Sequence, residues 1–254
     1  MKHLTYFLLI TMCITACSNN KKQPEKIPLT FNTTEYKEYS RLENKPEASL
    51  TAKIPTAEGD SIISKNINNV IFNTIRQTVG EENNKFSNYS EVFSNFIKSY
   101  EEFIIENPDA PGRWEISILG DVEYNTPEII NIKLNSYLMT GGAHGNRYTT
   151  SLLFDPKSGK EIQLADIIKD TTSLTSMAEK AFRGKYNIPD DKSINSTGLM
   201  FPDDKFILPQ NIFVSKDGLK LFYNTYEVAA YVEGTKEIDI PYDSIETNLL
   251  IKIK

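Results

Sequence analysis

The sequence predicts an α+β fold of two small domains, in which mainly antiparallel sheets carry packed helices. Apolar residues recur at helical spacing in two segments of the first half, and they alternate with a period of two from residue 114 onward. Strands and helices follow one another in clusters, whereas a parallel α/β sheet would need regular alternation. With 39% hydrophobic and 11% aromatic residues, a chain of this length can build a substantial core.

The first residues of the chain predict a lipoprotein signal peptide. Lys2 supplies a positive charge, and a short apolar run follows it. About 20 apolar residues are needed to cross a bilayer as a helix, so this run is too short to be a permanent anchor. Residues 14–17, Ile-Thr-Ala-Cys, have the aliphatic and small side chains that precede the cysteine of a lipoprotein cleavage site. We therefore expect residues 1–16 to be removed and Cys17 to carry lipid; the alternative is an ordinary secretory peptide with an incidental cysteine.

Residues 17–30 predict a flexible tether between this lipid and the folded body. They are mostly polar or charged and contain two prolines, so they cannot bury a useful apolar surface. Such a segment spans about 20 Å as a random coil. Ser18 follows the lipidated cysteine in place of the aspartate that retains lipoproteins in many inner membranes, and no acidic run comes after it. We expect an outer-membrane lipoprotein that faces the periplasm.

The first half of the body predicts one strand and two helices. Residues 48–54 alternate in character and precede Pro55, which is typical of a strand that ends there. Residues 60–79 place an apolar stripe on one helical face, and residues 90–106 repeat this pattern before Pro108. The stripe of the first helix consists of Ile63, Ile67, Val70, Ile71 and Ile75. Asp60 or Ser61 would cap its beginning, and Gly80 would close its end.

The second half predicts a series of strands with one further helix. Residues 174–186 have the helical pattern, and the turn residues 216–218 separate two short strands as in a hairpin. The strands expected from period-two alternation are residues 114–124, 128–139, 146–154, 211–215, 219–224 and 236–240.

Composition excludes several classes of function. A net charge of −6 is a poor electrostatic match for nucleic acid. Cys13 would leave with the signal peptide and Cys17 would carry lipid, so the mature chain has no cysteine pair for an internal disulfide. His144 is the only histidine outside the signal peptide, whereas a zinc site normally needs three or four nitrogen or sulfur ligands. With phosphate-binding and nucleophile-elbow motifs also absent, we expect no metal, no cofactor and no catalytic residue.

Two stretches resemble a known tandem of domains of unknown function. Residues 140–145 (Thr-Gly-Gly-Ala-His-Gly) and residues 154–166 resemble the junction of this tandem, and residues 211–242 resemble its second domain. The tandem forms the extracytoplasmic part of RsiV-type anti-sigma factors, which bind lysozyme, and it accompanies the catalytic domain of PdaC-type peptidoglycan deacetylases. The resemblance implies an N-terminal α+β domain at residues 31–146 and a C-terminal α+β domain at residues 147–254.

The resemblance transfers fold and compartment more directly than activity. No sigma-binding segment or transmembrane helix precedes the body in this sequence, and no deacetylase domain with its aspartate and paired histidines is found. We therefore expect neither an anti-sigma nor a deacetylase role. What the resemblance implies about partners is a lysozyme-like protein or peptidoglycan.

Two short segments contain the candidate ligand-binding residues. The glycine loop around His144 could hold a catalytic base, or it could be a tight turn whose imidazole bonds nearby backbone. The tyrosines between residues 223 and 231 could form a recognition surface or be ordinary sheet residues. The candidates are Gly141, Gly142, His144, Tyr226, Glu227 and Tyr231.

The function predicted from these features is non-enzymatic binding of a macromolecule by a lipid-anchored envelope protein. A first alternative is a cell-wall or carbohydrate hydrolase that uses His144 or an unidentified pair of carboxylates, such as a glycosidase would need. The adjacent acids at residues 190–191 and 203–204 are more typical of solvated loops than of a calcium site. A second alternative is a purely structural subunit of an outer-membrane assembly.

Overall fold

The structure is a computed structural model that describes residues 29–45, 47–59, 61–80, 86–110, 112–251 and 253. The predicted signal peptide, the lipidation site at Cys17 and the tether up to residue 28 lie outside the described residues. None of the helices formed by the described part of the chain is long and apolar enough to cross a bilayer.

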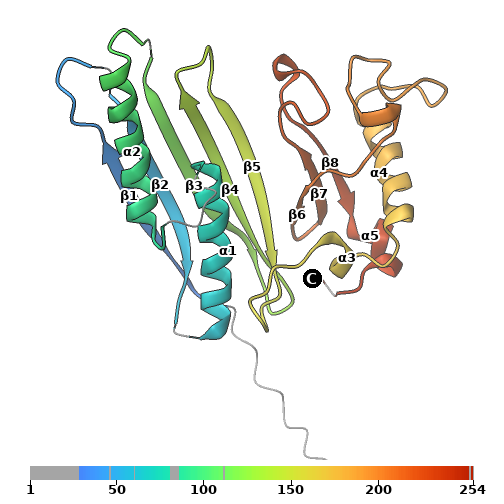
Figure 1. Cartoon of the computed structure of the whole chain (residues 1–254). Coiled ribbons are helices and arrows are strands. Elements are labelled where there is room, and N and C mark those ends of the chain that lie inside the picture. Colours follow the sequence, from blue (N-terminus) through green and yellow to red (C-terminus); the bar gives the residue numbers. More distant parts are fainter. Residues whose placement is uncertain are drawn as a thin grey trace, which may run out of the picture.

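Within the described residues, the chain forms a five-stranded sheet and a three-stranded sheet that lie side by side (Figure 1). The larger sheet has its strands in sequence order: β1 (Phe31–Tyr39), β2 (Ser49–Ala57), β3 (Trp114–Asn125), β4 (Ile130–Thr140) and β5 (Asn146–Phe154). Two helices, α1 (Ile62–Thr78) and α2 (Tyr89–Glu106), pack on one face of this sheet and bury their apolar stripes there. The predicted α+β class is confirmed.

The smaller sheet belongs to the C-terminal part of the chain. Its strands are β6 (Asn211–Val214), β7 (Gly218–Tyr223) and β8 (Lys236–Pro241), all antiparallel. Its helices are α3 (Leu164–Ile167), α4 (Thr171–Lys185) and α5 (Tyr242–Ile245), of which α4 packs across one face of the sheet. The predicted hairpin across residues 216–218 is therefore present as β6 and β7.

The helices begin where side chains satisfy free backbone N–H groups. Ser61 accepts the N–H of Ser64 at α1, Asn88 accepts at α2, and Asp170 accepts at α4. Gly80, with φ of +90°, follows α1 and ends it. These capping residues explain why the predicted helices begin and end within a few residues of the observed ones.

Strand β1 is an element that the sequence pattern did not predict. It is an edge strand, and most of its side chains are exposed, so no apolar residue recurs at every second position. Its pairing with β2 is antiparallel, whereas β2 and β3 form the parallel pair among the described strands. The sheet is thus mixed, and the two packed helices lie between its two parallel strands along the chain.

The prediction that a strand ends before Pro55 is wrong, because β2 continues to Ala57. The parallel pairing of β2 with β3 stops at Lys53, so a residue without an N–H breaks no ladder with β3 there. Gly120 on β3 leaves room for the proline ring: a Cβ atom at Gly120 would lie 2.4 Å from Pro55 Cδ. The proline and the glycine therefore fit each other across the sheet.

Strand β5 lies in the larger sheet, paired with β4 from Ile130–Phe154 to Leu138–Asn146. The division predicted at residues 146 and 147 thus falls at the beginning of β5, whereas the five-stranded sheet extends to Phe154. Ile129, directly before β4, and Leu153, near the end of β5, lie at the same end of this pair and are buried in the hydrophobic core of the C-terminal part. The two parts of the chain therefore share core residues.

The free edge of β5 faces the free edge of β6, and side chains join them. Both backbone groups of Thr149 bond to Asn224: the N–H donates to Oδ1 at 2.7 Å, and the C=O accepts from Nδ2 at 2.9 Å. The Ser151 N–H donates to Asn211 Oδ1 at 2.9 Å. Side-chain amides thus take the place of a neighbouring strand along β5.

Backbone groups on the free edge of β6 find their hydrogen-bond partners in side chains of the larger sheet. The Val214 N–H donates to Asn131 Oδ1 at 2.9 Å, and Ser151 Oγ donates to the Ile212 C=O at 2.7 Å. Asn131 Nδ2 in turn donates to Ser151 Oγ at 2.9 Å. We call these contacts, made by Asn131, Ser151, Asn211 and Asn224, the amide seam.

Removing the central amide of this seam should destabilise the protein. Asn131 is fully buried, so Asn131→Ala leaves the Val214 N–H without its partner, and we expect the free energy of unfolding to fall by about 1–3 kcal/mol. The matched control is Asn32→Ala on β1, where the side chain is exposed and we expect a change within about 0.5 kcal/mol. Urea unfolding of both variants measures the difference; equal effects would show that the seam contributes nothing particular to stability.

Candidate functional site

The structure brings the predicted histidine and two predicted tyrosines together. His144 lies in the loop between β4 and β5, and its ring stacks on Tyr231 with the centroids 4.4 Å apart and the planes at 18°. Tyr231 also contacts Tyr226, with the centroids 5.5 Å apart. Both tyrosines lie between β7 and β8 in the C-terminal part of the chain. We call these three rings the aromatic junction, because they connect loops of the two sheets.

The aromatic junction lies on the surface. Tyr226 is 54% exposed and Tyr231 is 37% exposed, while the neighbouring Val232 is 87% exposed. Exposed aromatic and aliphatic side chains that gather on loops are typical of recognition surfaces. Val232 was not predicted from the sequence, because a single valine in a loop carries no signal of its own.

One of the predicted glycines shapes the loop that carries His144. Gly141 has φ of +89°, a conformation that favours glycine. A Cβ atom at Gly112 would lie 3.3 Å from Gly141 Cα, so two backbones approach closely at this point. Gly142 has only the His144 carbonyl oxygen near its missing Cβ, at 3.7 Å. Gly141 therefore shapes the loop, whereas neither the backbone nor the space at Gly142 requires a glycine, and neither residue offers a side chain to a ligand.

Glu227 holds the turn that presents Tyr226. Tyr226 has φ of +68°, and the Glu227 N–H donates to the Asn224 C=O at 3.2 Å to close the turn. The Glu227 carboxylate accepts the N–H groups of Asn224 at 2.8 Å and Gln210 at 3.4 Å. Burial raises the pKa of this carboxyl, and the two backbone donors oppose that effect. Glu227 thus holds the turn that places Tyr226 in the junction.

Tyr223 does not belong to this surface. It is fully buried, and its hydroxyl donates to the Ile207 C=O at 2.6 Å. Burial raises the pKa of its hydroxyl, and its ring contacts Phe182 and Phe201 in the C-terminal core. Of the two interpretations of the tyrosine segment, the sheet-residue interpretation therefore holds for Tyr223.

The His144 ring has one polar contact among the described residues. Its Nδ1 lies 3.4 Å from the Gly145 carbonyl oxygen, and within the described residues no carboxylate is hydrogen-bonded or ion-paired to the ring. A general base normally needs a second group to orient it. In the same described part of the chain, no three His, Cys, Asp or Glu side chains gather closely enough to share a metal ion.

Comparison with known proteins identifies two adjacent family matches. Residues 42–147 match the family described as Deacetylase PdaC, and residues 152–243 match Protein of unknown function (DUF3298). None of the curated proteins matches the sequence. The predicted resemblance to this tandem of domains is confirmed.

Solved structures show the same fold. A member of the DUF3298 family from Bacteroides fragilis NCTC 9343 is 22% identical, with a TM-score of 0.69, and the match covers 87% of this chain and 93% of that one. A DUF3298 family protein from Pseudomonas aeruginosa PAO1 is 17% identical, with a TM-score of 0.61, and covers 88% and 95%. At these identities the similarity establishes the fold.

The raised pKa of Glu227 predicts a pH dependence of stability. The folded state favours the protonated carboxyl, so its contribution is complete below the unfolded pKa and is lost as the pH rises through the raised folded pKa. In Glu227→Gln we expect this decline to become shallower, because the amide carries no charge. Its single oxygen can accept the Asn224 N–H, whereas the weaker bond from the Gln210 N–H is lost, and that loss lowers stability equally at every pH. Urea unfolding between about pH 4 and pH 8 measures it.

The exposed Glu102 on α2 provides the control, since Glu102→Gln alters only a surface pair with Lys98. We expect stability to retain some decline with rising pH in Glu227→Gln, because burial also raises the pKa of Glu161. Superimposable profiles for wild type and Glu227→Gln would contradict the role given to Glu227.

Proposed function

Since the chain joins a PdaC-type domain to a DUF3298-type domain, we propose that it is a non-enzymatic, lipid-anchored envelope protein that binds a macromolecular partner through the aromatic junction. The observation that carries this proposal is the stack of His144 on Tyr231, which places rings from both parts of the chain on one exposed surface. Aromatic side chains give a large contact area at low cost in conformational entropy, and they dominate binding energy at protein interfaces.

The partner that we favour is a cationic protein of the lysozyme type. The net charge of −6 attracts such a protein and speeds its association. RsiV-type proteins, which the C-terminal half resembles, bind lysozyme. Glu233, beside Val232 at the edge of the junction, is paired with Lys236 at 3.4 Å and so adds little net charge there. Peptidoglycan is the second partner that the resemblance implies.

A catalytic role receives less support from the site. The rings of the junction offer contact area, and the carboxylate of Glu227 is engaged with two backbone N–H groups. A hydrolase would need a positioned base or a facing pair of carboxylates. We therefore propose that His144 contributes its ring face and not its proton chemistry.

Loss of the Tyr226 ring should weaken partner binding. Tyr226→Asn removes the ring while keeping a residue that tolerates a positive φ, so we expect the Kd for lysozyme to rise by about tenfold or more. The control is Tyr39→Asn on β1, whose ring is 46% exposed, comparable to Tyr226. Biolayer interferometry measures both, and His144→Ala should weaken binding in the same direction.

Each other outcome has a definite meaning. An unchanged Kd in Tyr226→Asn would remove the junction from the proposal. Retention on peptidoglycan sacculi that is lost in Tyr226→Asn, without lysozyme binding, would make the polymer the partner. Turnover of peptidoglycan fragments that disappears in His144→Ala would favour the hydrolase alternative.

The proposed anchor rests on the sequence at Cys17. In Cys17→Ala the thiol that accepts the lipid is gone, so we expect the protein to move from the membrane fraction to the soluble fraction and to lose label from radioactive fatty acid. Cys13→Ala, inside the predicted signal peptide, should change neither. Unchanged fractionation and labelling in Cys17→Ala would overturn the proposed anchoring and the outer-membrane, periplasm-facing location that depends on it.

A further inference from the structure

The two sheets turn their helix-free faces toward one hollow. Helices α1 and α2 cover one face of the larger sheet, and α4 covers one face of the smaller sheet. Side chains alternate between the two faces of a strand, so the sequence neighbours of the residues buried under the helices point to the helix-free face. A hollow of about 390 Å³ is lined by such residues from both sheets, among them Lys133 and Thr149 on one side and Lys220 and Phe222 on the other. This volume is typical of a site for a small organic molecule.

Two phenylalanine rings form the apolar part of the hollow. Phe213 and Phe222 lie edge to face, with the centroids 6.0 Å apart and the planes at 86°. Neither ring belongs to the two hydrophobic cores under the helices. Phe213 is only 7% exposed and supports the half-buried Phe222, whose partly exposed ring is available to a ligand that has an apolar surface of its own.

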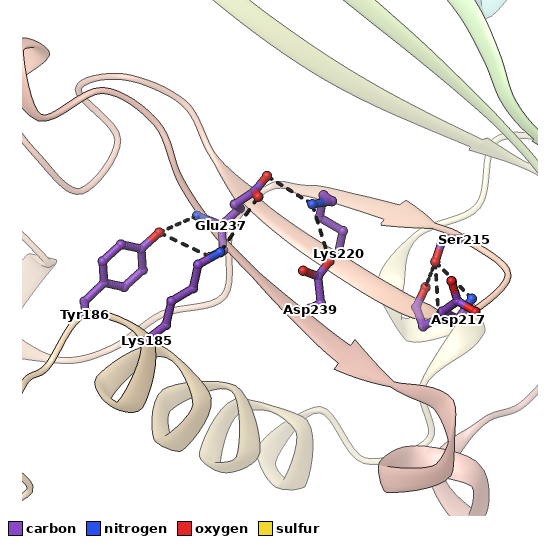
Figure 2. A network of polar contacts seen from close by, with 8 residues as sticks. Lys185, Tyr186, Ser215, Asp217, Lys220, Glu237 and Asp239 are labelled. Atoms are coloured by element: carbon purple, nitrogen blue, oxygen red, sulfur yellow. Dashed lines mark hydrogen bonds and ion pairs between the residues drawn. The ribbon is translucent and has the colours of Figure 1, made fainter.

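Lysine–carboxylate pairs from both sheets surround these rings. Lys133 Nζ lies 2.9 Å from Glu123 Oε1 on the larger sheet. Lys220 Nζ lies 3.1 Å from Glu237 Oε2 and 3.4 Å from Asp239 Oδ1 on the smaller sheet, as Figure 2 shows. The four charges that line the hollow cancel, so a ligand of either net charge gains little from them.

The pairs nevertheless retain unused hydrogen-bonding capacity. A carboxylate has about four acceptor positions and an ammonium group has three donors, of which one ion pair uses few. Asn135 and Thr149 add an amide and a hydroxyl group to the same hollow, where Thr149 Oγ1 donates to Asn135 Oδ1 at 3.0 Å, while the Ser215 hydroxyl is used within its own turn. A neutral molecule with many hydroxyl groups could bond to the charged pairs and to this Asn135–Thr149 pair while the ion pairs stay intact. A charged ligand would have to separate the pairs first.

We infer that this hollow is a binding site for a neutral oligosaccharide. A sugar ring has an apolar C–H face that packs on an aromatic ring and an edge of hydroxyl groups that bond to amides, carboxylates and ammonium groups. The combination of Phe222 with the Lys220–Glu237 pair matches both sides of such a ring. Because the lining residues come from both sheets, the bound sugar contacts the two parts of the chain at once.

A second hollow extends the site across the larger sheet. It has a volume of about 300 Å³ and shares Asn135 and Thr149 with the first. The guanidinium carbon of Arg147 lies 4.9 Å from the centroid of the Tyr137 ring at its side. Neighbouring strands are about 4.8 Å apart, so the second hollow, which reaches from β5 across β4 to β3, lengthens the site by about 10 Å. The adjoining hollows therefore suit a chain of several sugar rings rather than a monosaccharide.

This site is distinct from the aromatic junction. None of the residues that line the two hollows is His144, Tyr226 or Tyr231. The inference does not rest on the proposed protein partner, and either can fail while the other holds.

Calorimetric titration of the full chain with the neutral trisaccharide N,N′,N″-triacetylchitotriose tests the inference. Phe222→Leu keeps an apolar side chain but loses the flat ring, and Lys220→Met keeps the length of the side chain but loses its donors. We expect each to raise the Kd by about tenfold or more. Lys98→Met, in an exposed pair on α2, should leave it unchanged.

Thermal unfolding of each variant shows whether it is folded before the titration is interpreted. Absence of binding to the wild-type chain at millimolar trisaccharide would overturn the inference. So would a Kd that is the same in wild type, Phe222→Leu and Lys220→Met. Tighter binding of a zwitterionic tripeptide than of the trisaccharide would show that the ligand is charged and would overturn it as well.

Discussion

The amide seam is the constraint on which the arrangement of the two sheets depends. Strands β5 and β6 each expose an edge whose backbone groups need partners, and an unprotected edge of this kind invites pairing with another chain. Buried asparagine and serine side chains supply those partners in both directions. The β5–β6 edges are therefore joined through side chains, and the strands are free to meet at an angle that a continuous ladder of backbone bonds would not permit. Asn131 and Asn224 are buried with their amides bonded to backbone groups across the seam, and breaking those bonds is costly, so this geometry is held in place.

The surfaces above and beside the seam follow from that geometry. At one end of β5, the loop with His144 comes close enough to Tyr231 for their rings to stack. On the helix-free side, the same angle brings Phe222 and Lys220 of the smaller sheet opposite Lys133 of the larger one, so that a hollow forms between them. The shared core residues Ile129 and Leu153 support the contact from the helix side. Both candidate surfaces thus depend on two parts of the chain being held in one fixed relation.

The sequence pattern predicts most of the helices and strands, because the spacing of the apolar residues indicates which face of each element is buried. The helices show apolar stripes and capping residues, and β3 and the first half of β4 alternate between apolar and polar residues. Strand β1 gave no such pattern, since an exposed edge strand buries few side chains. Pro55 predicts the end of a strand because proline lacks the N–H that a paired strand needs. At Pro55, however, β2 is no longer paired with β3, so the strand can continue. Of the candidate site residues, His144, Tyr226 and Tyr231 lie together, while Gly141 and Glu227 shape the loops that carry them.

The sequence by itself determined the α+β class, which depends on local periodicity and turn chemistry, and its short motifs carried the resemblance to the tandem of domains. It also suggested candidate site residues. Only the tertiary structure decided which of those residues share a surface. The amide seam joins residues that are up to 83 positions apart, from Asn131 to Val214. The local sequence around either residue does not indicate that the other is its partner. The hollow lined by Phe222 and Lys220 was hidden for the same reason: an alternating strand tells which side chains face away from the helices, but the opposing wall belongs to another sheet, and its position is set by contacts distant in sequence.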